Sequence, residues 1–221
     1  MSGALLDRPV LAVYEAALRR AAAGRPAPLV LRDDRGGEHL LDPAAWCRAA
    51  LPGDRLLLTG CGGPTLDVGC GPGRLTAALT RRGRPALGVD VSAAAVRLAR
   101  RRGAAALLRD VFAPLPGHGR WRHVLLADGN IGIGGDPARL LRRCRDLLAP
   151  DGRLHAELAA PGERTWSGTA GLRAAGTDRE ETFPWAAVAV PDLPALAAAA
   201  GLRVLTIGTE ADRWFATLTP A

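Results

Sequence analysis

The chain has 221 residues, of which 48% are hydrophobic and 23% charged, a composition typical of a folded globular domain and not of a disordered or fibrous protein. Its 29 basic and 22 acidic side chains give a net charge of +7, and every basic side chain apart from the four histidines is an arginine. These arginines are spread over several predicted helices without interleaved aromatic residues, which favours a solvated surface over a nucleic-acid-binding face.

The first residues lack the pattern of a signal peptide, and no apolar run approaches the roughly 20 residues that span a bilayer. We therefore expect a cytoplasmic protein without a membrane segment. The four cysteines, Cys47, Cys61, Cys70 and Cys144, form no CxxC pair and have no histidine at zinc-ligand spacing. The sequence thus predicts neither a metal site nor a disulfide framework.

Residues 1–63 are predicted to form an N-terminal extension that packs on a core domain of residues 64–221. Within the extension, residues 11–23 follow a helical pattern, and residues 29–41 are predicted to form two short strands around a turn at 33–37. A further helix begins at Asp42 and Pro43, an N-cap residue followed by proline in the first turn.

From residue 64 onward, strands and helices alternate along the chain. The predicted strands are 65–68, 85–90, 104–109, 122–127 and 153–158, and the predicted helices are 73–82, 92–102 and 137–149. This alternation indicates a parallel sheet covered by helices.

The C-terminal region shows a different pattern. A helix at 195–200 precedes apolar runs at 202–207 and 214–218, which predict a hairpin and therefore an antiparallel end to the sheet. Residues 160–182, dense in Gly, Thr and charged residues, are predicted to form a long loop or lid.

The segment DVGCGPG, residues 67–73, places three glycines between a buried strand and a helix. Glycine adopts positive φ and lets a ligand approach the backbone, and this edge of an α/β sheet is where ligands bind. The spacing differs from the dinucleotide fingerprint GxGxxG, and Asp67 is a poor neighbour for a pyrophosphate. A nicotinamide-dependent dehydrogenase is therefore disfavoured, and a ligand with an ammonium group and no phosphate is favoured.

Together with Asp90, which closes the next strand in GVDVS, and Asp110, which closes the third in LLRDVFAPLPG, this segment resembles the class I S-adenosylmethionine-dependent methyltransferases. The resemblance extends over residues 64–221. It implies an α/β fold of three layers around a Rossmann-like seven-stranded sheet, mostly parallel with an antiparallel C-terminal hairpin. It also implies an enzyme that uses S-adenosylmethionine and releases S-adenosylhomocysteine.

The resemblance assigns Asp67 to the methionine ammonium group, Asp90 to the ribose hydroxyls and Asp110 to the adenine. The complete cofactor-binding set that it implies is Asp67, Gly69, Cys70, Gly71, Gly73, Asp90, Val91, Asp110, Val111 and Asp128. A carboxylate is able to accept hydrogen bonds from two adjacent hydroxyls, which agrees with the role of Asp90. The alternative is that Asp67 and Asp90 only cap helices or turns.

A second glycine-rich segment, ADGNIGIGGDP at 127–137, is predicted to face the substrate, with Asp128 or Asn130 orienting the acceptor; the alternative is a plain connector. Tyr14 and Trp166 are candidates to cover a bound ligand, or equally to anchor their own segments on the core. Methyl transfer needs a base only when the acceptor arrives protonated. The candidate bases are Asp128, His155 and Glu157, and a histidine in a strand is commonly structural.

The predicted function is methyl transfer to a small-molecule acceptor. Two alternatives stay open. The charge of +7 leaves methylation of RNA or another nucleic acid possible, although the NPPY-type and Pro-Cys motifs of two base-methylating subclasses are missing. The other alternative is a methyltransferase-like module that binds its ligand without catalysis. The sequence carries no signal for the oligomeric state.

Overall fold

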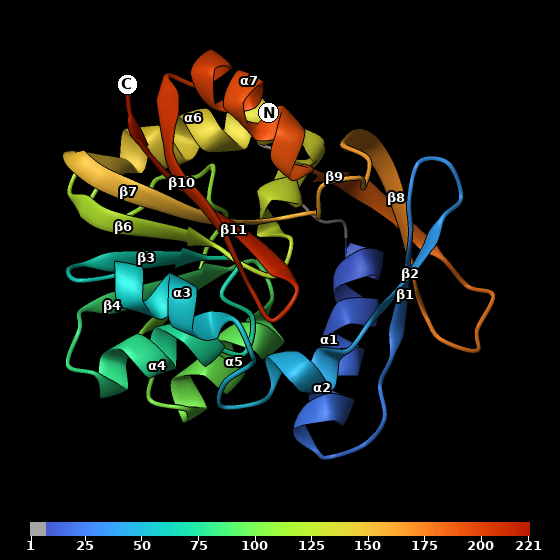
Figure 1. Cartoon of the computed structure of the whole chain (residues 1–221). Coiled ribbons are helices and arrows are strands. Elements are labelled where there is room, and N and C mark those ends of the chain that lie inside the picture. Colours follow the sequence, from blue (N-terminus) through green and yellow to red (C-terminus); the bar gives the residue numbers. More distant parts are fainter. Residues whose placement is uncertain (1–7) are drawn as a thin grey trace.

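The computed structural model describes residues 8–221, which form two β-sheets with helices around and between them (Figure 1). The larger sheet contains β3 (Thr65–Val68), β4 (Ala86–Asp90), β5 (Ala106–Leu108), β6 (Trp121–Leu126), β7 (Leu148–Leu158), β10 (Leu202–Glu210) and β11 (Arg213–Pro220). The smaller sheet contains β1 (Leu29–Arg32), β2 (Glu38–Leu41), β8 (Trp166–Ala174) and β9 (Glu181–Ala187).

Seven α-helices and two short 3₁₀ helices are present among the described residues. The α-helices are α1 (Arg8–Ala22), α2 (Pro43–Trp46), α3 (Asp54–Gly60), α4 (Arg74–Arg81), α5 (Ala93–Arg101), α6 (Pro137–Leu147) and α7 (Leu193–Ala199), and the 3₁₀ helices are η1 (Asn130–Gly135) and η2 (Val190–Asp192). None of the helices within residues 8–221 has the length and apolar character to cross a membrane.

The larger sheet has the strand order β10-β11-β7-β6-β3-β4-β5. Strands β3 to β7 pair in parallel, whereas β11 is antiparallel to both of its neighbours, β7 and β10. Sequence order reverses at β3, which pairs with β4 on one side and with β6 on the other, so a crevice opens at the carboxyl ends of these strands. The predicted sheet, including its antiparallel hairpin, is confirmed.

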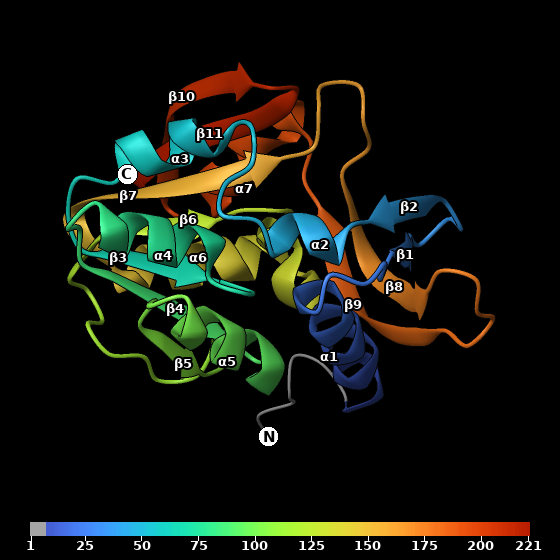
Figure 2. The same ribbon diagram turned by 90° about the horizontal axis from the view of Figure 1, so that it is seen from below.

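Helices cover both faces of this sheet, because successive side chains of a strand point to opposite faces. On β6, Val124 and Leu126 join the core beneath α6 and α7, whereas Leu125 joins the core beneath α3 and α4. Figures 1 and 2 show the two helical layers on either side of the sheet. The predicted three-layer Rossmann-like fold is therefore correct.

The smaller sheet joins two distant parts of the chain. Its order is β2-β1-β8-β9, with every pair antiparallel, and Leu31 on β1 lies opposite Leu172 on β8. The prediction of a loop over 160–182 is wrong, since this segment holds β8 and the start of β9. The glycines and threonines of β8 resemble turn residues in the sequence, but each lies in a paired strand position.

Helix α1 lies between the smaller sheet and α5 (Figure 2), and it packs on β8 and β9 on one side and on α5 on the other. Its side chains Val10 and Ala17 belong to a core cluster with Leu29, Trp166 and Phe183 of the smaller sheet. At the other side, Glu15 accepts hydrogen bonds from the Ser92 hydroxyl and the Ala94 N–H, each at 3.0 Å, at the N-terminus of α5. The smaller sheet and α1 thus form a cover over the carboxyl edge of the larger sheet.

Candidate functional site

A cavity of 310 Å³ lies between the carboxyl edge of the larger sheet and this cover. The loop between β3 and α4 supplies Gly69, Cys70 and Gly71 to its wall. Gly69 has φ of 68° and Gly71 has φ of 52°, backbone angles that residues other than glycine rarely adopt. The hydroxyl of Tyr14 on α1 lies 3.5 Å from the position that a Cβ of residue 71 would take. The glycines therefore leave bare backbone at the surface of the cavity.

Asp90, the last residue of β4, holds this glycine loop in place. One carboxylate oxygen accepts the Gly71 N–H at 2.9 Å, and the other accepts the Ser92 N–H at 2.8 Å. Asp90 is 7% exposed, and burial raises its pKa from 3.8 to about 6 despite these two bonds. The carboxylate lines the cavity and each of its oxygens retains a free lone pair.

The structure brings most of the predicted site residues to one cavity. Those that line it are Tyr14, Gly69, Cys70, Gly71, Asp90, Val91, Val111, Asp128 and Asn130. Burial keeps the pKa of the Cys70 thiol well above its usual value, so this side chain is neutral. The structure places these residues at one cavity, and their roles in binding stay predictions.

Asp67, Gly73 and Asp110 do not line the cavity, contrary to the expectation of three carboxylates around one ligand. Asp67 points to the α4 face, where it accepts a 2.6 Å hydrogen bond from the Thr76 hydroxyl, and burial raises its pKa to about 6. The side chain of Asp110 accepts the Phe112 N–H at 2.8 Å and so closes a local turn. A Cβ at position 73 would lie 2.7 Å from Ala99, so Gly73 allows α4 to approach α5.

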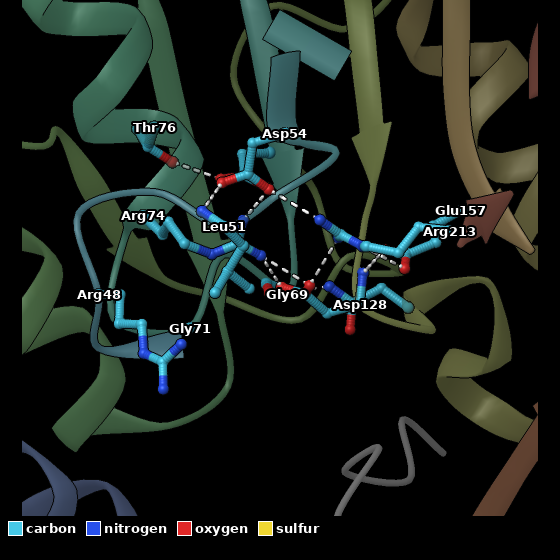
Figure 3. Close-up of polar contacts among 12 residues, drawn as sticks. Arg48, Leu51, Asp54, Gly69, Gly71, Arg74, Thr76, Asp128, Glu157 and Arg213 are labelled. Atoms are coloured by element: carbon cyan, nitrogen blue, oxygen red, sulfur yellow. Dashed lines mark hydrogen bonds and ion pairs between the residues drawn. The ribbon is translucent and has the colours of Figure 1, made fainter. Parts of the chain in front are cut away.

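A buried ionic network lies beside the glycine loop (Figure 3), and the sequence gives no hint of it. Arg74, the first residue of α4, is 3% exposed and pairs with Asp54 and Asp128. Arg213 binds Asp54 and Asp128 at 3.1 Å each and holds Glu157 with two hydrogen bonds of 2.7 and 2.8 Å. Two arginines therefore neutralise most of the charge of three carboxylates, of which Asp128 lines the cavity.

The candidate bases differ in their access to the cavity. Asp128 lines it, in a left-handed conformation with φ of 52°, and its N–H donates to Glu157 at 2.6 Å. Glu157 itself lies behind Asp128 and does not line the cavity. Both carboxylates are paired with arginines, and burial nevertheless raises the pKa of Asp128 above its usual value.

His155 is remote from the cavity and belongs to a buried chain of hydrogen bonds on the α3 face. The Gly62 N–H donates to His123 Nε2 at 3.1 Å, so the ring proton of His123 lies on Nδ1 and is donated to His155 Nε2, also at 3.1 Å. His155 Nδ1 then donates to the Thr217 hydroxyl at 3.2 Å. Burial lowers the pKa of His155 to about 3, which keeps it neutral. This placement corrects its interpretation as a candidate base.

Cys61 lies within 4.8 Å of these two histidines, a proximity that the sequence spacing did not show. Its thiol donates to the Leu57 carbonyl at 3.2 Å, and burial raises its pKa to about 12. The ring nitrogens of both histidines are already used in the hydrogen-bond chain. A protonated thiol and two occupied imidazoles form a packed polar core.

The second glycine-rich segment lines the cavity and also contacts β9 of the cover. Gly129 and Gly134 line the cavity, whereas a Cβ at Gly132 would overlap the carbonyl oxygen of Ala186 on β9. Asn130 donates from Nδ2 to the carbonyls of Val68 and Gly69, each at 2.9 Å, and so braces the first glycine loop. The segment was predicted to face the substrate because of its glycines. Gly132, however, serves to let the segment contact β9 of the cover.

The two aromatic residues singled out in the sequence have different places. Tyr14 lines the cavity. Its pKa is raised well above the ordinary value by burial and by the nearby Asp90, so the phenol is protonated. Trp166 is 7% exposed and packs in the core between α1 and the smaller sheet, away from the cavity. It anchors the cover, as the alternative interpretation expected.

Comparisons with known proteins agree with this geometry. Residues 65–152 match a family model described as a methyltransferase domain. No curated protein sequence matches the chain. A solved S-adenosylmethionine-dependent methyltransferase from Bacteroides fragilis, in complex with S-adenosyl-L-homocysteine, is 22% identical with a TM-score of 0.78, over 99% of this chain and 98% of that one.

Two further solved structures share the fold. The 1,6-didemethyltoxoflavin-N1-methyltransferase of Burkholderia thailandensis is 20% identical with a TM-score of 0.58, over 100% of this chain and 93% of that one. A sugar N-methyltransferase from a Streptoalloteichus species is 21% identical with a TM-score of 0.53, over 76% of this chain and 83% of that one. The family match and the strand order of the larger sheet together identify residues 65–152 as a methyltransferase domain with a Rossmann-like fold.

Proposed function

We propose that this chain binds S-adenosylmethionine on the glycine loop and transfers its methyl group to a small-molecule acceptor held beneath the cover. The observation that carries the proposal is the covered cavity itself, in which bare backbone at Gly69 and Gly71 lies next to the Asp90 carboxylate. Proteins of the same fold have been solved with S-adenosylhomocysteine.

The residues present fit such a nucleoside. Asp90 has two oxygens with free lone pairs for adjacent ribose hydroxyls, and Val91 and Val111 offer apolar surface for a base. Gly69 and Gly71 leave room where a Cβ would stand in the way. Asp90 has no ion-pair partner among the described residues, so its ionised carboxylate offers a negative charge that suits a sulfonium or an ammonium group.

When bound, the sulfonium supplies a methyl carbon that an acceptor lone pair attacks in line, with the carbon–sulfur electrons returning to sulfur. The chain contributes position, because Asp90 fixes the glycine loop and α1 closes over it. Exclusion of water by the cover strengthens the interaction of the Asp90 carboxylate with the positive centre. Tyr14 remains protonated and so acts as a hydrogen-bond donor.

Calorimetry and thermal shift with S-adenosylhomocysteine and with NAD⁺ test the cofactor. We expect S-adenosylhomocysteine to bind and to raise the melting temperature, and NAD⁺ to do neither. Asp90→Ala should weaken the binding about ten- to a hundredfold through loss of a charge-assisted contact. Asp146→Ala, on the exposed face of α6, is the matched control and should leave the affinity unchanged.

The acceptor class is tested with radiolabelled S-adenosylmethionine. Label should enter a low-molecular-weight fraction of a metabolite extract, and none should enter RNA or DNA at physiological salt. Transfer to nucleic acid would replace the small-molecule proposal by its first alternative. Tight cofactor binding without label transfer to any fraction would favour the non-catalytic module.

A further inference from the structure

The two walls of the cavity differ in chemistry. The wall formed by the larger sheet carries the glycine loop and the charged side chains Arg74, Asp90, Arg109 and Asp128. The opposite wall is formed by the smaller sheet, which contributes Pro184 and six large apolar side chains that line the cavity: Leu29, Leu31, Leu41, Leu172, Phe183 and Trp185. The polar wall fits the nucleoside proposed above, so the apolar wall is left for the acceptor.

The strand register explains how these six residues come to face the same way. Opposite partners on antiparallel strands, and residues two apart on one strand, point to the same face of a sheet. Leu31 lies opposite Leu172, Leu29 lies opposite Leu41, and Phe183 lies opposite Ala170, two positions from Leu172. The six residues therefore share one face of the smaller sheet, on which His39 and Glu181 are the charged or polar positions outside the cavity lining.

Aromatic side chains are concentrated at this cavity. The chain has five Trp, three Phe and one Tyr, and four of these nine line it. They form two pairs: Tyr14 with Trp46, at 6.0 Å between ring centroids, and Phe183 with Trp185, at 5.6 Å. The first pair comes from α1 and α2 and the second from β9, elements whose separate places Figure 1 shows. Flat rings on several sides suit a planar ligand.

The charges in the cavity argue against an ionised acceptor. Arg74 and Asp128 pair with each other, Asp90 accepts backbone N–H groups, and Arg109 is exposed at the rim. The residues that line the cavity from the smaller sheet, α1 and α2 include no charged side chain within the described part of the chain. A charged group placed there would lose its hydration without gaining a partner.

We propose that the methyl acceptor is an uncharged, planar aromatic or heteroaromatic compound. Its ring lies against Trp46, Phe183 and Trp185, and its nucleophilic atom points toward the glycine loop, where the Tyr14 hydroxyl is within reach as a hydrogen-bond donor. This inference rests on the proposed function, because it assigns to the acceptor the part of the cavity that the nucleoside leaves.

The test uses the full chain saturated with S-adenosylhomocysteine, so that the polar wall is occupied. Calorimetry then compares three probes, namely 2-naphthol, naphthalene-2-sulfonate and glucosamine. We expect 2-naphthol to bind, the sulfonate to bind at least about tenfold more weakly because its charge is desolvated, and glucosamine not to bind. Failure of 2-naphthol to bind, or tighter binding of glucosamine, overturns the inference.

Two variants locate the ring. Trp185→Leu and Trp46→Leu should each weaken 2-naphthol about three- to tenfold, the range of an aromatic pair, and leave S-adenosylhomocysteine affinity unchanged. Trp121→Leu, at a tryptophan on β6 that does not line the cavity, is the control and should change neither affinity. Unchanged 2-naphthol affinity in both cavity variants overturns the inference. Absence of S-adenosylhomocysteine binding in the unaltered chain, by contrast, defeats the proposed function itself.

Discussion

The polar wall and the cover of the cavity are stabilised in different ways. The polar wall is fixed by directional contacts, since Gly69 and Gly71 adopt positive φ, Asp90 binds the loop, and Arg74 is locked between two carboxylates. The cover is held mainly by packing of apolar side chains between α1 and the smaller sheet. Directional contacts specify one geometry, whereas apolar packing tolerates exchange of side chains of similar volume. The cover is therefore the wall on which acceptor specificity is able to change without loss of the nucleoside site.

The largest effect is expected where the polar wall is most constrained. Arg74→Met removes a guanidinium that is 3% exposed and leaves Asp54, itself 2% exposed, with a single arginine partner. Loss of one partner from a buried ion pair costs about 3–5 kcal/mol of unfolding free energy. Urea denaturation measures this change.

Arg55→Met is the matched control for that variant. Arg55 lies on α3 and pairs with Glu210 at 2.8 Å, but its side chain is 70% exposed. Such surface pairs contribute below about 1 kcal/mol. Equal losses in the two variants would mean that the buried network does not stabilise the polar wall more than a solvated pair.

The next effect concerns the joint between the two walls. Gly132 lies on η1 against the backbone of Ala186 on β9, so Gly132→Ala forces the cover away from the second glycine-rich segment. Overpacking of this kind costs about 1–3 kcal/mol. Hydrogen exchange should show faster exchange of β9 amides than in the unaltered chain.

Gly62→Ala provides the comparison for this joint, because a Cβ at position 62 meets no atom within 4 Å. We expect its unfolding free energy and its β9 exchange rates to stay close to those of the unaltered chain. If Gly132→Ala behaved in the same way, the cover would be free to shift without disturbing η1, and the two walls would be mechanically independent.

The polar wall was also the more predictable of the two from sequence. Three glycines between an apolar strand and a helix require a special backbone, and the structure shows positive φ at Gly69, Gly71 and Gly73. The direction of Asp67 was predicted wrongly, although its apolar neighbours Leu66 and Val68 share the opposite face of β3 and already place it on the α4 side.

The cover and the ionic network were not predicted, because each is formed by segments that are far apart in the sequence. Strand β8 pairs with β9, its neighbour along the chain, on one side, but its partner on the other side, β1, is far away in the sequence. Arg74 stands in a chain rich in arginines, where a solvated position is the ordinary expectation, and its partners Asp54 and Asp128 come from two other segments. Local pattern reveals a turn or a helix face, whereas a contact between distant segments depends on the completed fold.

A smaller effect is expected from pH, which should change the stability of the unliganded protein and its ligand affinity in opposite directions through Asp90 of the polar wall. Burial raises the pKa of Asp90 from 3.8 to about 6, so this group reduces the stability of the unliganded protein as pH rises between these values. Binding of ribose hydroxyls needs the ionised form, so S-adenosylhomocysteine affinity should rise about tenfold from pH 5 to pH 7. Calorimetry across this range measures the effect.

Asp90→Asn and Asp67→Asn distinguish the two buried carboxylates, since burial raises the pKa of each to about 6. The Asp90 variant should flatten the dependence of affinity on pH, whereas the Asp67 variant should retain it, because Asp67 does not line the cavity. Retention of the full dependence in Asp90→Asn would remove this carboxylate from the nucleoside site.

The smallest effect is expected at the one directional contact described above for the cover. Glu15 on α1 accepts the Ala94 N–H and the Ser92 hydroxyl, and these bonds at the N-terminus of α5 lower its pKa below the usual value. Its stabilisation is therefore present above the ordinary pKa of glutamate and is lost as pH falls. Glu15→Gln keeps an acceptor oxygen but removes the charge, which should reduce the unfolding free energy by about 1 kcal/mol.

Arg19→Gln isolates that contact, because Arg19 pairs with Glu15 at 3.3 Å through a side chain that is 56% exposed and forms no side-chain hydrogen bond to α5 among the described residues. We expect a smaller loss than in Glu15→Gln, and only Glu15→Gln should speed hydrogen exchange in α1. Equal losses would mean that the charge of Glu15 contributes nothing at α5. Apolar packing alone would then hold α1 over the cavity, and the contrast between a directional polar wall and an adaptable cover would be complete.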